Sequence, residues 1–263
     1  MNLHLDNAVV VISGGSGAIG SAVAERMLQE GARVALLARD NHKLQQLQQR
    51  LERWADRVLT LSADCTSPQA CRAALVQVLA RWDDIDVLVN CAGGAARYPA
   101  EQLDADAWLN GFHHKFLPCV TLQDAVLAHW REYPSVAAGV VARRAIVNVI
   151  GTGGKIPGPQ HISGGAANAA LMLATIGLAG AYGRKGVRIN AVNPAMIDKQ
   201  TRVGEGLLSL SALPEELHND AHPFGRHGTP WEVANTVAFL ASPLASYING
   251  AMVSVDGGLK AVV

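Results

Sequence analysis

The sequence predicts an α/β fold in which a doubly wound parallel sheet of seven strands is flanked by helices. Short β-rich runs alternate with helical patterns along all 263 residues, which is typical of βαβ units. The runs are continuously apolar, as expected for strands that are covered on both faces. The strands are expected at Ala8–Ser13, Arg33–Ala38, Val58–Ser62, Asp86–Asn90, Ala145–Ile150, Val187–Val192 and Met252–Val255.

Helical patterns fill the intervals, and no repeat or low-complexity linker divides the chain, so we expect one domain spanning residues 1–263. One segment, Lys199–His227, breaks the alternation because it is polar and carries Pro214 and Pro223. It follows the carboxyl end of a strand, where doubly wound sheets bind ligands, and we expect a substrate lid there. The helices are expected at Ala18–Glu30, Asn41–Trp54, Pro68–Trp82, Ala105–Trp130, Gly165–Tyr182 and Pro230–Ala241.

Composition narrows the range of partners. The 22 Lys and Arg residues balance 22 Asp and Glu residues, which argues against nucleic-acid and membrane-surface partners. The four cysteines form no CxxC pair, and the first residues lack the basic region of a signal peptide, so we expect a cytoplasmic protein with reduced thiols. Gly165–Gly183 approaches membrane length, but it is rich in Ala and Gly and is interrupted by Asn168, which favours a buried interface helix.

A glycine-rich loop follows the first expected strand and opens the first expected helix. Residues Ser13–Gly20 read SGGSGAIG. Glycines in such a loop permit a tight turn, let backbone N–H groups approach a pyrophosphate, and place that group at the positive end of the helix. Its position between strand and helix predicts a Rossmann-type dinucleotide site.

Four further motifs follow in order along the chain. They are Asn90-Cys91-Ala92-Gly93, Arg188 to Ala195 (RINAVNPA), Pro223 to Ala234 (PFGRHGTPWEVA) and Val255-Asp256-Gly257-Gly258. Together with the glycine loop they resemble the short-chain dehydrogenase/reductase family, whose patterns include TGxxxGxG, NNAG and RxNxxxPG. In this chain Ser13 stands for the family's threonine and Ala18 for the middle glycine. The resemblance covers nearly the whole chain and implies a nicotinamide cofactor.

The resemblance also implies which residues contact that cofactor. The glycine loop is expected at the pyrophosphate and ribose, residues 64 and 65 at the adenine, residues 90 to 93 beside the adenosine ribose, and residues 194 to 197 at the nicotinamide amide. The residues implied are Gly14, Ser16, Gly17, Ile19, Asp64, Cys65, Asn90, Ala92, Gly93, Pro194, Met196 and Ile197.

The end of the second strand favours NADP(H) over NAD(H). NAD-dependent enzymes place a carboxylate near the ribose 2′-hydroxyl, whereas a 2′-phosphate needs positive charge. Here Ala38 stands at the carboxylate position and Arg39, whose guanidinium suits phosphate, follows it. The alternative is that Arg39 is only a solvated residue at the start of a helix. Gly17 stands where many family members add a second basic residue.

The family's catalytic positions hold other residue types. The resemblance implies a serine at a strand end that orients the substrate carbonyl, a tyrosine as general acid and a lysine four residues later. Gly151, Gly164 and Asn168 stand at these positions with the family's spacing preserved. Lys115 stands where the family usually has an asparagine. Because loss of a positioned general acid costs roughly 10²–10⁴-fold in rate, the inherited mechanism cannot run unchanged.

Three residues near the vacated positions are candidates for the missing chemistry. His161 precedes Gly164 by three residues and its side-chain type titrates near neutrality, so it is a candidate acid. Lys115 and Thr152 are the other candidates. The competing interpretations are a loop histidine bonded to backbone or water, a lysine that binds water or cofactor, and a threonine that only forms a turn.

No metal is expected. His218 and His222 have the i, i+4 spacing of a zinc-binding helix, but the intervening glutamate is missing and Pro223 follows at once. Polarity of the expected lid explains this pair better.

These observations predict an NADP(H)-dependent oxidoreductase that acts on a small carbonyl or alcohol substrate with a non-standard proton donor. Two alternatives stay open: a catalytically silent cofactor-binding homologue that regulates or partners another protein, and a lyase or isomerase that uses the same pocket. The Ala-rich helix Gly165–Gly183 corresponds to a helix that the family uses in tetramer contacts, so we expect a homo-oligomer, either a dimer or a tetramer.

Overall fold

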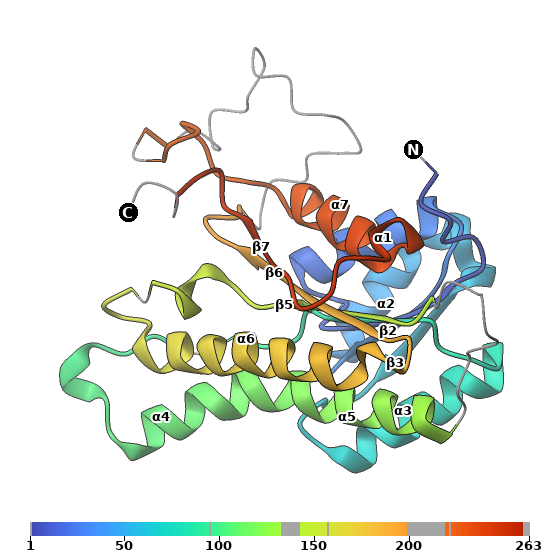
Figure 1. Ribbon diagram of the computed structural model, residues 1–263, viewed down its shortest axis with the longest axis horizontal. Helices are drawn as coiled ribbons and strands as arrows, with labels where there is room; N and C mark the ends of the chain where they lie inside the picture. The colour runs from blue at the N-terminus through green and yellow to red at the C-terminus, as the bar shows by residue number, and fades with distance from the viewer. Residues whose placement is uncertain are drawn as a thin grey trace.

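A parallel sheet of seven strands forms the centre of the protein (Figure 1). The computed structural model describes residues 2–94, 96–132, 143–156, 158–198, 219–220 and 222–259. The strand order is β3-β2-β1-β4-β5-β6-β7, with every neighbouring pair parallel, which confirms the predicted doubly wound fold. The strands are β1 (Val9–Ser13), β2 (Arg33–Ala38), β3 (Val58–Ser62), β4 (Val87–Asn90), β5 (Ala145–Val149), β6 (Arg188–Pro194) and β7 (Met252–Val255).

Helices cover both faces of this sheet (Figure 1). On one face lie α1 (Ala18–Gln29), α2 (Asn41–Arg50) and α7 (Pro230–Ala241). On the other lie α3 (Pro68–Trp82), α5 (Leu117–Glu132) and α6 (Ile162–Gly183). The strands are therefore buried on both faces, which explains their continuous apolar sequence.

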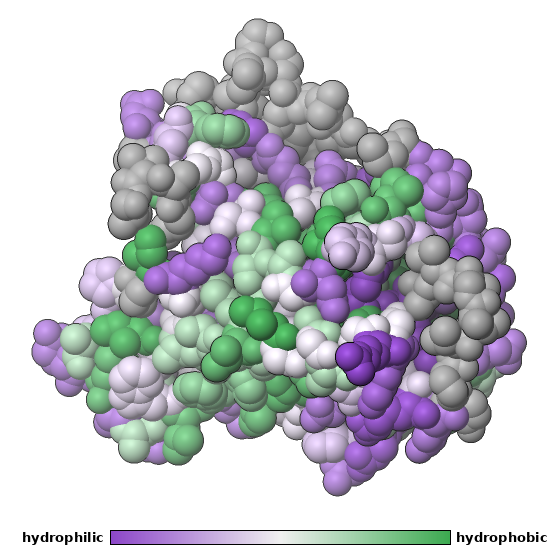
Figure 2. All heavy atoms as spheres, in the orientation of Figure 1, coloured by the Kyte–Doolittle hydropathy of each residue, from purple (hydrophilic) through white to green (hydrophobic). Residues whose placement is uncertain are grey.

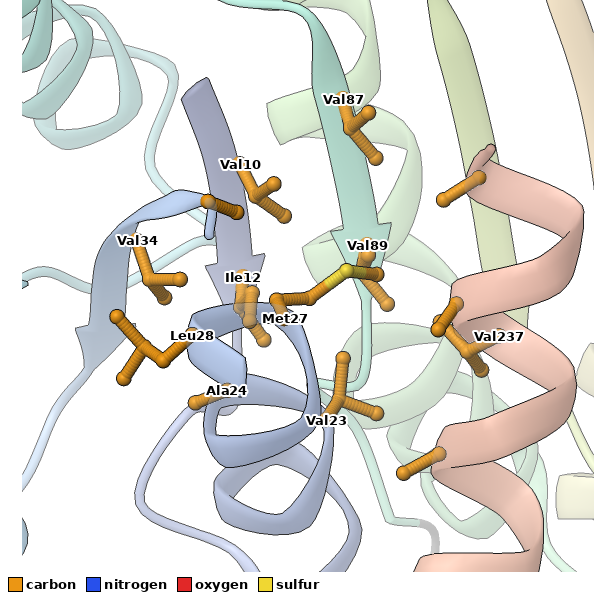
Figure 3. Packing of buried hydrophobic residues seen from close by; sticks show 14 of the residues in the cluster. Val10, Ile12, Val23, Ala24, Met27, Leu28, Val34, Val87, Val89 and Val237 are labelled. Carbon is orange, nitrogen blue, oxygen red and sulfur yellow. The ribbon is translucent and has the colours of Figure 1, made fainter. Parts of the chain in front are cut away.

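Alternation along β1 shows how one strand supplies both cores. Val10 and Ile12 pack in the cluster under α1 and α7, whereas Val9 and Val11 pack in the cluster under α3 and α5. Figure 3 shows the first cluster, in which Met27 of α1 lies over the valine and isoleucine side chains of the sheet. These contacts hold α1, the helix that follows the glycine loop, against the sheet.

Two predicted helices are interrupted. The helix expected at Asn41–Trp54 ends at Arg50, where the C-cap Leu51 has φ −96° and ψ 15°, and the 3-10 segment η1 (Glu52–Arg57) follows it. Trp54 interrupts η1 in turn, with φ −123° and ψ 27°. The helix expected at Ala105–Trp130 comprises α4 (Ala105–Gly111), a π-helical turn η3 (Phe112–Phe116) and α5. Hydropathy periodicity does not reveal a single wider turn, although π turns are frequent at functional sites.

Smaller differences concern element ends and short connections. α6 begins at Ile162, three residues before the predicted start, and β6 extends to Pro194. The remaining short segments are η2 (Ala100–Gln102), η4 (Thr152–Gly154) and η6 (Pro243–Ala245).

Helix α6 is long and apolar enough to cross a membrane by length and composition alone, but half of its most apolar window is buried inside the domain. Residues along its length, from Ser163 to Ala179, face the interior. A core helix meets the same length and composition test, so this helix is weak evidence for a membrane span.

Candidate functional site

The glycine loop packs directly on the carboxyl end of β4. Gly14 has φ +66°, and a Cβ placed there would lie 2.7 Å from the backbone nitrogen of Ala92. Gly17 is the N-cap residue of α1, and its own N–H donates to the Gly14 carbonyl at 3.0 Å. Only glycine tolerates both the left-handed conformation and this contact at position 14. The loop therefore presents a cradle of mainly glycine backbone at the amino end of α1, which fits a pyrophosphate.

A cavity of about 330 Å³ adjoins this cradle at the carboxyl ends of β1, β2 and β4. Eight of the thirteen predicted cofactor residues line it, which brings together parts of the chain that are far apart in sequence. They are Gly14, Ser16, Gly17, Arg39, Asp64, Cys65, Ala92 and Gly93.

The other five predicted cofactor residues do not line this cavity. Ile19 and Ile197 pack against the hydrophobic cluster under α1 and α7, and Asn90 is buried at the end of β4. Pro194 ends β6, and Met196 beyond it is exposed with φ +51°. Their roles toward a cofactor stay predictions.

Lys43, which the sequence pattern did not single out, also lines the cavity. It stands in the first turn of α2, four residues after Arg39, and both side chains line this cavity. Asp40 lies between them and caps α2, because its Oδ1 accepts from the Lys43 backbone N–H at 3.1 Å. That hydrogen bond, with the Lys43 ammonium 3.6 Å away, lowers the pKa of the Asp40 carboxyl. The four-residue spacing was the signal that could have found Lys43.

The Asp64 carboxylate lies at the far end of the same cavity. It accepts from the backbone N–H and the hydroxyl of Thr66, at 2.9 and 2.8 Å. These hydrogen bonds, with smaller contributions from the Arg39 and His113 charges, lower the pKa of the Asp64 carboxyl. An ionised acceptor there fits the predicted contact with an exocyclic amine.

A buried polar network that the sequence analysis did not anticipate lies beneath the cavity. The Ser13 hydroxyl donates to Asn90 Oδ1 at 3.3 Å and accepts from the Ala92 N–H at 3.2 Å. Asn90 Nδ2 donates to Asn148 Oδ1 at 2.9 Å, and Asn148 Nδ2 donates to Thr175 Oγ1 at 3.0 Å. The network joins β1, β4, β5 and α6 through satisfied buried groups, which holds the strand ends around the cavity in one arrangement.

Glycines line the end of β5, where the resemblance predicts a serine. Gly151 has φ +123°, a conformation that side-chain-bearing residues rarely adopt. The turn η4 then lies on α6, since a Cβ on Gly154 would be 2.8 Å from the backbone nitrogen of Ala169. By contrast, Cβ positions on Gly151 and Gly153 meet Asn168 Nδ2 at an ordinary 3.5 Å. The backbone conformation at Gly151 is therefore one that glycine adopts readily and serine does not.

His161 stands beside this glycine turn. It is the half-buried N-cap residue of α6, and its ring Cδ2 lies 3.2 Å from the Cβ position of Gly153. Its Nδ1 is enclosed and makes no hydrogen bond among the described residues. Burial, reinforced by the positive charges of Arg97 and Lys115, lowers the pKa of the His161 imidazole from its ordinary value. This environment favours the neutral form of the ring.

Lys115 is buried at the same strand end. Its Nζ donates to the carbonyl oxygen of Val149, the last residue of β5, at 3.2 Å. It belongs to the π turn η3, which packs closely on Gly93, because a Cβ there would be 3.0 Å from the His114 carbonyl oxygen and 3.2 Å from the Lys115 Cα. The π turn thus brings a cation to the space between β5 and α6.

The three candidate catalytic residues therefore meet at one place. Thr152 is buried in η4, directly after Gly151, while His161 and Lys115 approach from α6 and η3. Because all strands are parallel, this place and the cofactor cavity lie on the same edge of the sheet.

The expected lid, Lys199–His227, falls mostly outside the described residues, and so does His218. Within the described part of the chain, no group of three or more His, Cys, Asp or Glu side chains is placed to hold a metal ion.

Comparison with known proteins places this geometry among oxidoreductases. The model of a family described as enoyl-(acyl carrier protein) reductase matches residues 14–260. A 2-(S)-hydroxypropyl-CoM dehydrogenase of Xanthobacter autotrophicus is 32% identical over the full length of both chains. A probable 2,4-dienoyl-CoA reductase of Bacillus subtilis is 28% identical, over 97% of each chain.

A solved structure is similar over nearly the whole fold. It is the NADPH-bound structure of a short chain oxidoreductase from Pseudomonas aeruginosa PAO1, described as containing an atypical catalytic center. It is 27% identical, with a TM-score of 0.83, over 96% of each chain.

Proposed function

The chain belongs to the short-chain dehydrogenase/reductase family, and from that premise we propose that it is an NADP(H)-dependent oxidoreductase that moves protons without the family's tyrosine. Its substrate is a small molecule with a carbonyl or alcohol group. A nicotinamide cofactor bound at the glycine loop supplies the hydride. The chain's own residues bind the cofactor, hold the substrate oxygen and exchange its proton.

One observation carries the preference for NADP(H): Arg39 and Lys43 both line the cavity beside Ala38. The two cations match the charge of a ribose 2′-phosphate, and a guanidinium can bind it in bidentate fashion. The nearby Asp40 carboxylate is engaged by the first turn of α2 and by Lys43. The NADPH-bound relative from Pseudomonas aeruginosa is consistent with this choice.

We assign the proton transfer to His161. Its ring lies at the turn that follows β5, near the cofactor edge, and its Nδ1 lacks a partner among the described residues. The lowered pKa makes the neutral ring available as a base for alcohol oxidation at pH 7. In the reverse direction the protonated ring is the acid, so carbonyl reduction gains as the pH falls.

A second candidate function is reduction of a carbon–carbon double bond conjugated to a carbonyl. Hydride addition to such a system needs the oxygen to be held in the transition state, while the proton ends on carbon. The Asn168 amide and the Lys115 ammonium, which lie near Gly151 and at the end of β5, are hydrogen-bond donors of the kind that hold such an oxygen. The resemblance to a 2,4-dienoyl-CoA reductase favours the same reaction.

The first experiment separates binding from chemistry. Fluorescence titration with NADPH and NADH is expected to show saturable, tighter binding of NADPH. The holoenzyme is then given 4-deuterated NADPH, each stereoisomer in turn, with aldehydes, ketones, 2-enoyl thioesters and 2,4-dienoyl thioesters. Deuterium on the carbinol carbon of an alcohol supports the first candidate function, and deuterium on a carbon of a former double bond in a thioester supports the second. Saturable binding with no deuterium transfer to any compound contradicts both.

We also propose that the protein assembles as a homo-oligomer through the face formed by α4, α5 and α6. Leu109, Leu117, Leu173 and Ile176 are exposed there, with 72% of Leu173 and 67% of Leu109 accessible. Figure 2 shows hydrophobic side chains gathered over α6 and α4. An apolar patch of this kind marks an interaction surface. Size-exclusion chromatography with light scattering is expected to give a dimer or tetramer, and Leu173→Glu is expected to reduce it to smaller species.

A further inference from the structure

The position that the resemblance assigns to lysine holds a side chain that reaches the position assigned to serine. Asn168 lies in the second turn of α6 and is 4% exposed. Its Nδ2 is 3.5 Å from the Cβ positions of Gly151 and of Gly153. A serine at position 151 would carry its hydroxyl one bond beyond that Cβ. The amide nitrogen of Asn168 therefore lies within contact range of the space that such a hydroxyl would use.

The hydrogen bonds of this amide are not satisfied within the described residues. The Oδ1 atom is fully enclosed and accepts no hydrogen bond. The Nδ2 atom donates no hydrogen bond either, but it is not enclosed and therefore keeps some accessible surface. Buried amides are normally paired. An unpaired N–H donor that keeps accessible surface and is held in place by a buried helix is typical of a group that hydrogen-bonds to a bound ligand.

The glycines make this placement possible. Gly151 lacks a Cβ and takes φ +123°, and the Cβ position of Gly153 lies 3.5 Å from the Asn168 amide nitrogen and 3.2 Å from the His161 ring. Larger side chains at either residue would press into the space beside the amide. The two glycines and Asn168 therefore depend on one another, because the amide occupies space that side chains at positions 151 and 153 would restrict.

From this geometry we propose that Asn168 Nδ2 donates the hydrogen bond that holds the substrate oxygen, in place of the serine hydroxyl. This inference rests on the proposed oxidoreductase function. A carboxamide does not exchange a proton at neutral pH, so Asn168 orients and polarises the oxygen while the proton is moved by another group. It serves both candidate reactions, since each develops negative charge on an oxygen.

The test needs no natural substrate. Isobutyramide is an unreactive amide whose carbonyl accepts a hydrogen bond, and its binding to the NADPH complex is followed by calorimetry. Wild type is expected to bind it saturably. Asn168→Leu removes the donor at similar volume, and Asn168→Asp replaces it with an acceptor. Each is expected to weaken isobutyramide binding at least tenfold and to leave the dissociation constant for NADPH within about twofold. Asn235→Asp makes the same exchange on the exposed face of α7 and is expected to change neither.

With any compound that the deuteride panel identifies, the Asn168 variants are expected to lose roughly 10²–10³-fold in kcat, as for removal of one oxyanion donor. Unchanged isobutyramide binding in Asn168→Leu overturns the proposal, and so does an equal loss of NADPH affinity, which would place Asn168 in the cofactor site. Absence of isobutyramide binding in wild type overturns it as well. If the panel yields no hydride transfer but isobutyramide binding depends on Asn168, the oxygen site stands and the oxidoreductase function fails.

Discussion

The two halves of the active edge use glycine for opposite reasons. In the cofactor loop, a Cβ on Gly14 would lie 2.7 Å from a backbone nitrogen, and one on Gly20 would meet the Gly14 carbonyl directly. After β5, the Cβ position of Gly151 meets Asn168 at an ordinary 3.5 Å, although Gly154 of the same turn again brings two backbone segments together, with its Cβ position 2.8 Å from the Ala169 nitrogen. Gly14 and Gly20 thus let backbone segments touch, whereas Gly151 leaves space beside a side chain. Backbone contacts therefore specify the cofactor loop, while our proposal concerns the space beside Gly151.

The largest effect on cofactor binding is expected at Gly14, where the glycine loop contacts the backbone of Ala92. Gly14→Ala forces a side chain into a left-handed conformation, which costs about 1–3 kcal/mol, and into contact with Ala92. NADPH binding is expected to weaken on the order of 100-fold, measured by fluorescence titration with thermal denaturation as the check on folding. Gly158→Ala is the control, because no atom lies within 4 Å of that Cβ position. Wild-type affinity in Gly14→Ala would contradict the close approach.

The basic pair is expected to have the next effect. The double variant Arg39→Ala, Lys43→Ala removes two solvent-exposed cations that would bind a phosphate, and because solvent weakens each bond the pair together contributes about 1.5–3 kcal/mol. NADPH affinity is expected to fall roughly 10–100-fold while NADH affinity changes little. Arg50→Ala removes one charge from the other end of α2 and serves as the control. An equal fall in the affinities for NADPH and NADH would contradict this prediction, because the two residues would then bind a part that both cofactors share rather than the 2′-phosphate.

Restoring the family's serine is expected to harm the protein. Gly151→Ser places a side chain at φ +123°, so the free energy of unfolding is expected to drop by about 1–3 kcal/mol without a gain in turnover. Chemical denaturation of Gly151→Ser and of the control Gly158→Ser measures this. A stable and faster Gly151→Ser variant would show that the turn is an ordinary serine turn after all.

The smallest effect is a shift in the pH dependence of the reaction when a positive charge near His161 is removed. The Lys115 ammonium lowers the pKa of the His161 imidazole, so Lys115→Met is expected to raise that pKa. The pH below which carbonyl reduction reaches its full rate then moves upward. Lys155→Met removes an exposed charge that bonds Ser254, and it is expected to leave the profile in place. Single-turnover rates across pH compare the two variants.

The seven strands, their parallel pairing and the glycine loop could be predicted from the sequence, because alternating β and α patterns and a glycine-rich turn are local signals. It did not reveal the π turn that aims Lys115 inward, since one widened turn leaves helical periodicity almost intact. The Asn90–Asn148 bond was missed because it joins residues 58 positions apart. The contact between Asn168 and Gly151 was missed for a related reason. The sequence shows that glycine stands at position 151, but it does not show which side chain from another element lies beside it.

His161→Ala tests the central claim most directly, because that claim is a retained cofactor site served by a different proton carrier. The rate of single-turnover deuteride transfer from deuterated NADPH is expected to fall roughly 10²–10⁴-fold, with the dissociation constant for NADPH unchanged. The rise of wild-type carbonyl reduction toward low pH is expected to disappear in the variant. An unchanged rate and pH profile in His161→Ala would contradict the account.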